Sequence, residues 1–169
     1  MAAERTAVLG LGNPVVSDDR VGLAVAEAVR RLLEQSPVDN VEVLESTRGG
    51  FELIDLLGGF SYAVIIDCLT LPSPTPGRVQ RLTLSHVAGS ARLINAHEIS
   101  IGEAFEFATR LGKEMPATVE IFGVEGGDTS TISEAMTHPV AAAVEPLARE
   151  IHAMLAARAA KPDQGPAGH

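Results

Sequence analysis

Three polar residues of the sequence combine side-chain types that divalent metal ions bind. Asp19 follows a glycine-containing loop, Asp67 ends an apolar run, and His97 lies in a polar stretch that precedes a helical pattern. Two carboxylates and one imidazole, with water completing the shell, would suit nickel, zinc or a similar ion at an open site. The three residues are far apart in the sequence, so this hypothesis requires a fold that brings them together.

Each of the three residues also has a structural explanation. Asp19 belongs to a helix start at which Ser17 or Asp18 would cap the helix, and Asp19 would favour the positive end of its dipole. Asp67 must find a partner or shift its pKa, and bonding to backbone N–H groups in the next turn explains it equally well. His97 is as suited to a helix cap as to a metal ligand.

Other motifs that carry chemistry are incomplete. The stretch Gly10-Leu11-Gly12 lacks the third glycine of a dinucleotide fingerprint, since Val15 stands in its place. The dipeptide that begins at His97 is followed by Ile101 where a zinc protease helix requires a second His, and no G-x-S-x-G is present. The single cysteine, Cys68, is expected to be a small buried hydrophobic residue and not a nucleophile.

The composition disfavours several classes of protein. The 169 residues include 13 Lys and Arg against 22 Asp and Glu, a net charge of −9, with one Tyr and no Trp. This balance opposes nucleic acid as a partner, because phosphate binding needs positive charge and base stacking needs aromatic rings. No apolar stretch approaches a membrane span, and a lone cysteine points to a reducing compartment. We therefore expect a cytoplasmic protein that does not insert into a membrane.

Hydrophobic periodicity predicts alternating strands and helices. Strands are expected over residues 6–10, 41–44, 62–68, 79–84 and 118–124, and helices over 21–33, 51–57, 100–111 and 137–160. This alternation predicts a three-layer α/β/α sandwich around a twisted, mostly parallel sheet of about five strands. One domain is expected over residues 4–160, followed by a disordered tail over 161–169.

The connection at residues 71–77 contains three prolines and is too short for a crossover helix. Adjacent parallel strands need such a crossover. The strands at 62–68 and 79–84 are therefore expected to be antiparallel or not adjacent, which gives the sheet one antiparallel strand.

Ligands of open α/β sheets bind beyond the carboxyl ends of the strands. In this sequence that rule selects the loops over residues 12–19 and 47–50, together with Asp67. Within these loops, Gly12, Asn13, Asp18, Gly49 and Gly50 are the expected lining of a substrate cleft.

Several segments occur in an order that resembles the hydrogenase maturation proteases. They are Leu9-Gly10-Leu11-Gly12-Asn13, Ser17-Asp18-Asp19-Arg20-Val21-Gly22, Gly49-Gly50-Phe51-Glu52-Leu53, Ile65-Ile66-Asp67, Pro76-Gly77, Ala96-His97-Glu98 and Gly123-Val124-Glu125. The pattern G-x-G-N-x-x-x-x-D-[DE]-x-x-G after a first strand is specific, and the resemblance covers nearly the whole chain. Arg20 departs from the small residue often found at its position.

The resemblance implies an endopeptidase that removes the C-terminal extension of a nickel-iron hydrogenase large-subunit precursor after nickel insertion. The family's metal-binding residues match Asp19, Asp67 and His97, which would be both catalytic and metal-contacting. The nickel would be supplied by the substrate as a recognition element, with no organic cofactor. The proposed chemistry is attack by water on a peptide bond that the nickel positions or polarises.

Two alternative functions stay open on the sequence. Peptidyl-tRNA hydrolases also begin with a G-L-G-N-P stretch, but their pattern continues with Thr-Arg-His-Asn, and this chain has no His before His86. A non-catalytic chaperone could dock on the nickel-loaded large subunit through the same residues. Cleavage of the precursor distinguishes a protease from a chaperone.

Overall fold

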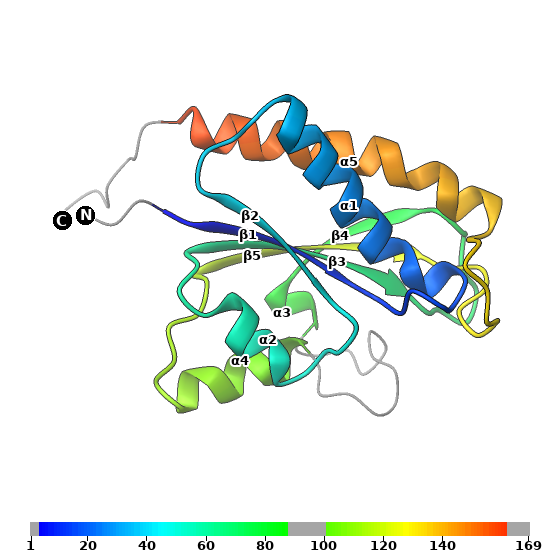
Figure 1. Cartoon of the computed structure of the whole chain (residues 1–169). Coiled ribbons are helices and arrows are strands. Elements are labelled where there is room, and N and C mark those ends of the chain that lie inside the picture. The colour runs from blue at the N-terminus through cyan, green and yellow to red at the C-terminus, as the bar shows by residue number, and fades with distance from the viewer. Residues whose placement is uncertain (1–3, 88–100, 162–169) are drawn as a thin grey trace.

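The computed structural model describes residues 4–87 and 101–161 and contains a five-stranded sheet (Figure 1). Its order is β2-β1-β3-β5-β4, with all neighbours parallel except β4 and β5. The strands are β1 (Thr6–Leu11), β2 (Val41–Ser46), β3 (Tyr62–Leu69), β4 (Val79–Thr83) and β5 (Thr118–Glu125).

Helices cover both faces of the sheet, so the predicted three-layer α/β/α sandwich with a mostly parallel sheet is confirmed (Figure 1). Helices α1 and α5 lie on one face, and α2 and α4 lie on the other. The helices are η1 (Asp18–Arg20), α1 (Val21–Gln35), α2 (Glu52–Leu57), α3 (Leu84–Val87), α4 (Ile101–Arg110) and α5 (His138–Ala159). Within the described ranges, no helix is both long enough and apolar enough to cross a lipid bilayer.

The fourth strand confirms the expectation drawn from the proline-rich connection. Strand β4 is antiparallel to β5 and is separated from β3 by it, so no crossover helix is needed. The short helix α3 was not predicted, because the strand was expected to continue through Leu84, where α3 instead begins.

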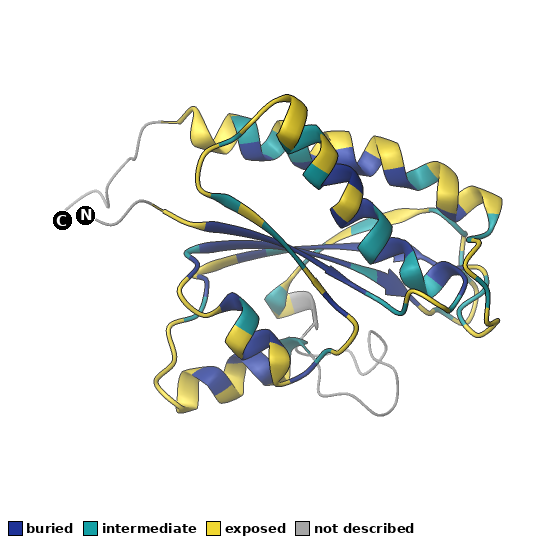
Figure 2. Ribbon diagram, in the orientation of Figure 1, coloured by how far each residue is buried: buried dark blue, intermediate teal, exposed yellow. Residues whose placement is uncertain are grey.

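Two hydrophobic clusters hold the layers together, one on each face of the sheet (Figure 2). Helices α1 and α5 pack against one face, with Val25, Val29 and Ile151 fully buried. Helices α2 and α4 pack against the other through residues such as Leu53 and Ala104. Burial on both faces explains why β1 and β3 are almost continuously apolar.

The sheet has a switch point between β1 and β3. The chain passes from β1 to β2 on one side and continues through β3 toward β5 on the other, so connections leave in opposite directions. Pairing of β1 with β3 ends at Gly10 and Ile66, whereas β3 stays paired with β5 through Leu69. The strands separate at their carboxyl ends, where open α/β sheets bind ligands.

Glycines let helix α1 approach the point at which β1 and β3 separate. A Cβ atom at Gly22 would overlap the carbonyl oxygen of Leu11 and lie 2.5 Å from that of Ile66. A Cβ atom at Gly10 would lie 2.7 Å from the Cβ of Ala26. The first turn of α1 therefore rests directly on the ends of β1 and β3, which fixes the position of the loop before it.

The contact at Gly22 predicts that Gly22→Ala destabilises the protein. Backbone carbonyls cannot move aside, so we expect a loss of about 3 kcal/mol in the free energy of unfolding, at the upper end of the usual cost of overpacking. Gly58→Ala is the control, because its nearest contact is 3.1 Å away at an exposed helix end. Urea denaturation measures both variants, and equal unfolding midpoints would contradict this account of α1 packing.

Candidate active site

Asp19 lies in η1, the turn that joins β1 to α1. Its side chain is partly exposed, and its backbone carbonyl packs against Gly12, where any Cβ atom would collide with it. Because Gly22 seats the next turn on the ends of β1 and β3, Asp19 lies at the switch point of the sheet. The sequence predicted the same position for Asp19, at the carboxyl ends of the strands.

Asp67 is the first residue of β3 beyond its pairing with β1. It still pairs with Gly123 of β5, and its Oδ1 accepts a hydrogen bond from the Cys68 backbone N–H at 2.8 Å. Because β3 continues to Leu69, this hydrogen bond lies within the strand and not in the following turn, where the sequence placed it. The side chain nevertheless remains partly exposed at the place where the neighbouring strand has departed.

The charges of both carboxylates affect the thiol of Cys68. Burial raises the pKa of the Cys68 thiol, and the negative charges of Asp67, Asp19 and Asp18 raise it further. The side chain is buried, as the sequence predicted. A thiol in this setting stays protonated at neutral pH, so it does not supply a thiolate nucleophile.

The single cysteine provides a test of this convergence. Asp67→Asn and Asp19→Asn each remove a negative charge near Cys68, so each should lower the thiol pKa and increase the rate of alkylation at alkaline pH. Asp39→Asn, at an exposed turn, is the control and should leave the rate unchanged. Iodoacetamide labelling across a pH series, followed by mass spectrometry, measures the rate. A pH profile of Asp19→Asn identical to that of the wild-type protein would place the Asp19 carboxylate away from Cys68.

Asp18 is fully buried and serves as a hydrogen-bond acceptor for the loop between β5 and α5. Its Oδ2 accepts from the backbone N–H groups of Gly127 and Asp128, both at 2.8 Å. Its Oδ1 accepts from the Thr137 N–H at 2.7 Å, and the Thr137 hydroxyl bonds the same carboxylate. The Asp18 carboxylate therefore joins the loop before α1 to the loop between β5 and α5.

The expected capping arrangement at this helix start is wrong. Neither Ser17 nor Asp18 makes a side-chain cap to η1 or α1. Ser17 Oγ instead donates to the Ala135 carbonyl at 3.0 Å, and the Arg20 guanidinium donates to the Glu134 carbonyl. These polar groups point across to the β5–α5 loop, because contacts between distant loops outweigh the local cap.

Removing the Asp18 carboxylate should destabilise the fold. Asp18→Ala leaves three backbone N–H groups and one hydroxyl without their acceptor, so we expect a loss of about 3 kcal/mol or more. The exposed Asp39→Ala should change stability by no more than about 0.5 kcal/mol. Chemical denaturation followed by circular dichroism compares them. A stable Asp18→Ala protein would show that the two loops are held by other contacts.

Glu125 is a buried acidic residue whose role the sequence analysis did not identify. It ends β5 and accepts hydrogen bonds from Gln80 Nε2 at 2.8 Å and from the Thr75 N–H at 2.6 Å. The hydrogen bond from Gln80, then that from Thr75 and the charge of Arg78, lower the pKa of the Glu125 carboxyl. The sequence feature that could have identified Glu125 is a charged residue at the end of an apolar run, the same feature that indicated Asp67.

The remaining predicted cleft residues lie in the loops that the sequence selected. Gly12 and Asn13 follow β1, and Asn13 Oδ1 accepts a hydrogen bond from the Val15 N–H at 3.1 Å. Gly49 and Gly50 lie between β2 and α2, where Gly50 has a φ of 71°, a backbone conformation that favours glycine. Their contacts with substrate stay a prediction.

His97 lies outside the described residues, so its place relative to Asp19 and Asp67 stays a prediction. Over residues 4–87 and 101–161, no group of three or more His, Cys, Asp or Glu side chains is arranged to hold a metal ion. The two carboxylates supply oxygen donors, which suit a divalent ion only when further ligands join them.

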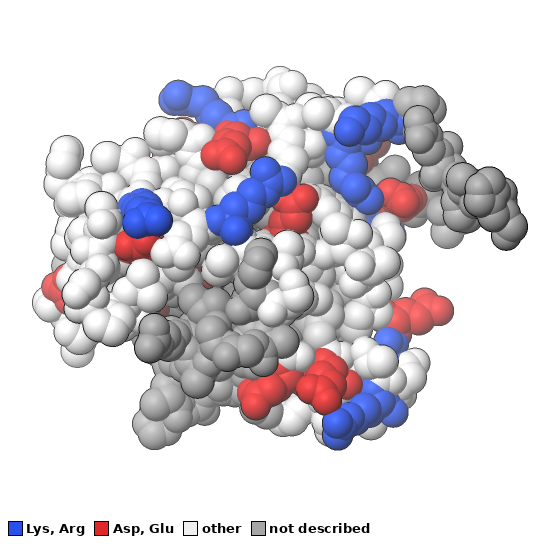
Figure 3. Space-filling view, turned by 180° about the vertical axis from the view of Figure 1, so that it is seen from behind, with Lys and Arg blue, Asp and Glu red and all other residues white. Residues whose placement is uncertain are grey.

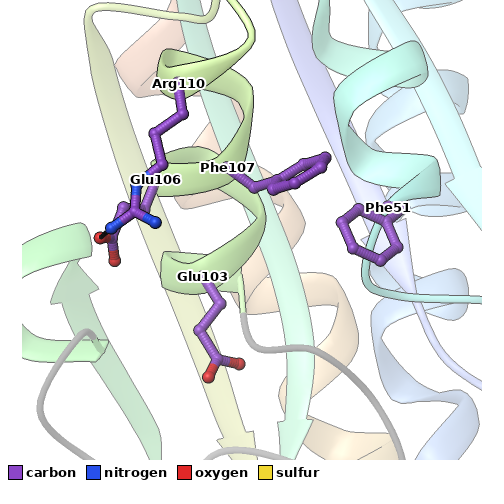
Figure 4. Close-up of a pocket in the computed structure, with 5 residues that line it drawn as sticks. All are labelled: Phe51, Glu103, Glu106, Phe107 and Arg110. Atoms are coloured by element: carbon purple, nitrogen blue, oxygen red, sulfur yellow. Dashed lines mark hydrogen bonds and ion pairs between the residues drawn. The ribbon is translucent and has the colours of Figure 1, made fainter.

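A separate hollow of about 360 Å³ lies between α2 and α4 (Figure 4). Phe51 and Phe107 meet edge to face across it, with ring centroids 4.9 Å apart. Glu103, Glu106 and Arg110 complete the lining, and Glu106 pairs with Arg110 at 2.8 Å. The lining includes neither Asp19 nor Asp67, so this hollow is distinct from the carboxylate pair.

Charged side chains on the face in Figure 3 are interspersed in sign. Among the described residues of that face, basic side chains lie beside acidic ones and form no extended positive area. The exposed pairs include Arg158 with Glu4 at 3.3 Å.

Comparison with known proteins identifies relatives of the chain. The family model for hydrogenase maturation proteases, HycI, matches residues 23–154. The hydrogenase 2 maturation protease of Escherichia coli strain K12 is 27% identical over 154 residues, which cover 89% of this chain and 90% of that protein. The hydrogenase expression/formation protein HupD of Thiocapsa roseopersicina is also 27% identical, over 84% of this chain and 67% of that protein.

Solved structures share the fold. The hydrogenase maturating endopeptidase HybD from Escherichia coli matches with a TM-score of 0.75 and 22% identity, over 91% of this chain and 93% of that one. The hydrogenase maturation protease HycI from Thermococcus kodakarensis matches with a TM-score of 0.71 and 19% identity, over 89% and 92%. The family match, which covers most of the chain, favours the protease over the peptidyl-tRNA hydrolase that the sequence left open. The chain therefore belongs to the hydrogenase maturation protease family and is a peptidase.

Proposed function

We propose that this protein is an endopeptidase that removes the C-terminal extension of a nickel-iron hydrogenase large-subunit precursor after nickel insertion. The observation that carries this proposal is the packing of the first turn of α1 on the carbonyl groups of Leu11 and Ile66, which puts the turn of Asp19 beside the strand end that carries Asp67. The family match supports a protease acting in hydrogenase maturation. His97 is the proposed third member of the site.

The charges of this site favour a cationic substrate. The negative charges of Asp67, Asp19 and Asp18 all act on the Cys68 thiol. Like charges repel more strongly where burial excludes water. A divalent nickel ion bound to the substrate would offset this repulsion, so the site should prefer nickel-loaded precursor to the nickel-free form.

In this proposal the nickel is part of the substrate and Asp19, Asp67 and His97 contact it. Their contacts hold the scissile peptide at the carboxyl ends of β1 and β3, where a water molecule attacks it. Cys68 takes no part in the attack, since its thiol stays protonated. Asp18 and Gly22 act only by fixing the loop that carries Asp19.

Substitution of the three proposed site residues tests this function. Asp19→Asn, Asp67→Asn and His97→Ala should each reduce cleavage of nickel-loaded precursor at least about a hundredfold, because each removes a contact to the reacting assembly. Asp39→Asn and Cys68→Ala should cleave at the normal rate. Mass spectrometry of the precursor measures release of the extension.

Three outcomes would contradict parts of the proposal. Wild-type protein that binds the nickel-loaded precursor without changing its mass would indicate a docking role. Normal cleavage by both Asp19→Asn and Asp67→Asn would show that the carboxylate pair is not the active site. Equal cleavage of nickel-loaded and nickel-free precursor would remove nickel as the recognition element.

A further inference from the structure

Two loop segments beside the carboxylate pair form a short antiparallel ribbon. The Ser17 N–H donates to the Thr131 carbonyl at 3.0 Å, and the Ser133 N–H donates to the Val15 carbonyl at 3.0 Å. These bonds bracket a β-bridge between Val16 and Ile132. The ribbon therefore joins the β1–α1 loop, which carries Asp19, to the β5–α5 loop (Figure 1).

The hydrogen-bond pattern turns the backbone of Ile132 away from its partner strand. In an antiparallel pair bonded only through the flanking residues, the N–H and C=O of the two central residues point outward. On the Val16 side these groups are used, since its N–H donates to Asn13 and its carbonyl accepts from Arg20. On the other side, no hydrogen bond to the Ile132 backbone occurs among the described residues.

Two large apolar side chains of this ribbon are exposed. Ile132 is 84% exposed and Val15 is 49% exposed, although both are large and apolar. Folded proteins usually cover or charge an open strand edge, because it pairs readily with other chains. An uncovered edge with an apolar side chain is the arrangement that a partner strand can occupy.

The ribbon is held firmly in place. Asp18 binds the N–H groups of Gly127 and Asp128, just before the outer segment. Asp128 Oδ1 in turn accepts from the N–H groups of Ser130 and Thr131 at 3.2 and 3.0 Å. A preformed edge costs less conformational entropy on binding than one that must first become ordered.

The ribbon is continuous with the proposed active site. Ser17 ends its inner segment, and Asp19 follows two residues later in the same loop. Gly126, at the start of the outer loop, packs against Cys68: a Cβ atom there would lie 2.8 Å from the sulfur. The Ile132 edge therefore belongs to a loop that also packs against Cys68, the residue that follows Asp67.

We propose that the backbone edge of Ile132 binds an extended segment of the substrate's C-terminal extension as an added β-strand. The N–H and C=O of Ile132 pair with the backbone of that segment, and the Ile132 side chain packs on an apolar side chain of it. Backbone pairing requires an extended chain and reads little sequence, which suits a tail that is cleaved away. This inference rests on the proposed function, because it names how the same site holds its substrate.

Photo-crosslinking tests the contact directly. With p-benzoylphenylalanine in place of Ile132, irradiation with nickel-loaded precursor should join the two proteins through the precursor's C-terminal extension. The same group in place of Leu111, which is 55% exposed just after α4, is the control and should give no such product. Mass spectrometry locates the linkage. Crosslinks only to the folded body of the precursor, or to a second copy of this chain, would overturn the proposal.

Kinetics provide a second measurement. Ile132→Asp removes the apolar contact and Ile132→Pro removes the outward N–H, so each should raise KM about tenfold while kcat stays within about twofold. Leu111→Asp should change neither constant, and Ile132→Val should restore a near-normal KM. Unchanged thermal unfolding of the variants shows that the fold is retained. An unchanged KM in both Ile132→Asp and Ile132→Pro would overturn the proposal.

The two proposals fail in different ways. If the wild-type protein cleaves precursor but residue 132 gives no crosslink to the extension, the edge is not the binding site and the proposed function stands. If residue 132 crosslinks to the extension without cleavage by the wild-type protein, the edge is a binding site and the proposed function fails. If neither crosslinking nor cleavage occurs, both are overturned.

Discussion

The buried carboxylate of Asp18 is the interaction on which the arrangement of the site depends. It joins the loop after β1 to the loop after β5 through four hydrogen-bonded groups, at Gly127, Asp128 and Thr137. A fully buried charge is tolerated only when its acceptor sites are filled. Filling them with backbone groups from a distant loop fixes that loop in one position. The same hydrogen bonds therefore also position Asp19, which follows Asp18, and the ribbon at Ile132, which belongs to the bound loop.

Close packing at the switch point supplies the second constraint. Gly22 allows α1 to rest on the carbonyl groups that end β1 and β3, so the helix cannot shift along the sheet. Asp67 is held from the other side by its pairing with Gly123. Two carboxylates, one in the turn η1 and one in strand β3, are thus held by rigid elements at the ends of β1 and β3. Such rigidity is what positioning a substrate requires, because small displacements of reacting groups cost large factors in rate.

The acidic residues at this end of the sheet fall into two groups, which differ in burial. Asp18 and Glu125 are buried and satisfied by donors from neighbouring loops, so they hold the scaffold. Asp19 and Asp67 remain partly exposed. Burial, together with their negative charge, raises the pKa of the nearby Cys68 thiol, which therefore stays protonated. This division suits a site that receives a cation with its substrate and needs no thiolate of its own.

The sequence by itself determined the layers of the fold and the loops that carry the site. Hydrophobic periodicity marked strands such as β3 and helices such as α5, since burial on one or both faces leaves a regular pattern. The rule for parallel sheets then placed Asp19 and Asp67 at one edge. The sequence assigned Asp19 to the metal-contacting residues and Asp18 to a helix cap or the cleft lining, and only the tertiary structure showed that Asp18 is a buried acceptor for a distant loop. Their roles differ because Asp18 faces backbone donors more than a hundred positions away. Such distant pairing leaves no local signal, and for the same reason the Glu125 contacts and the open edge at Ile132 were visible only in the folded chain.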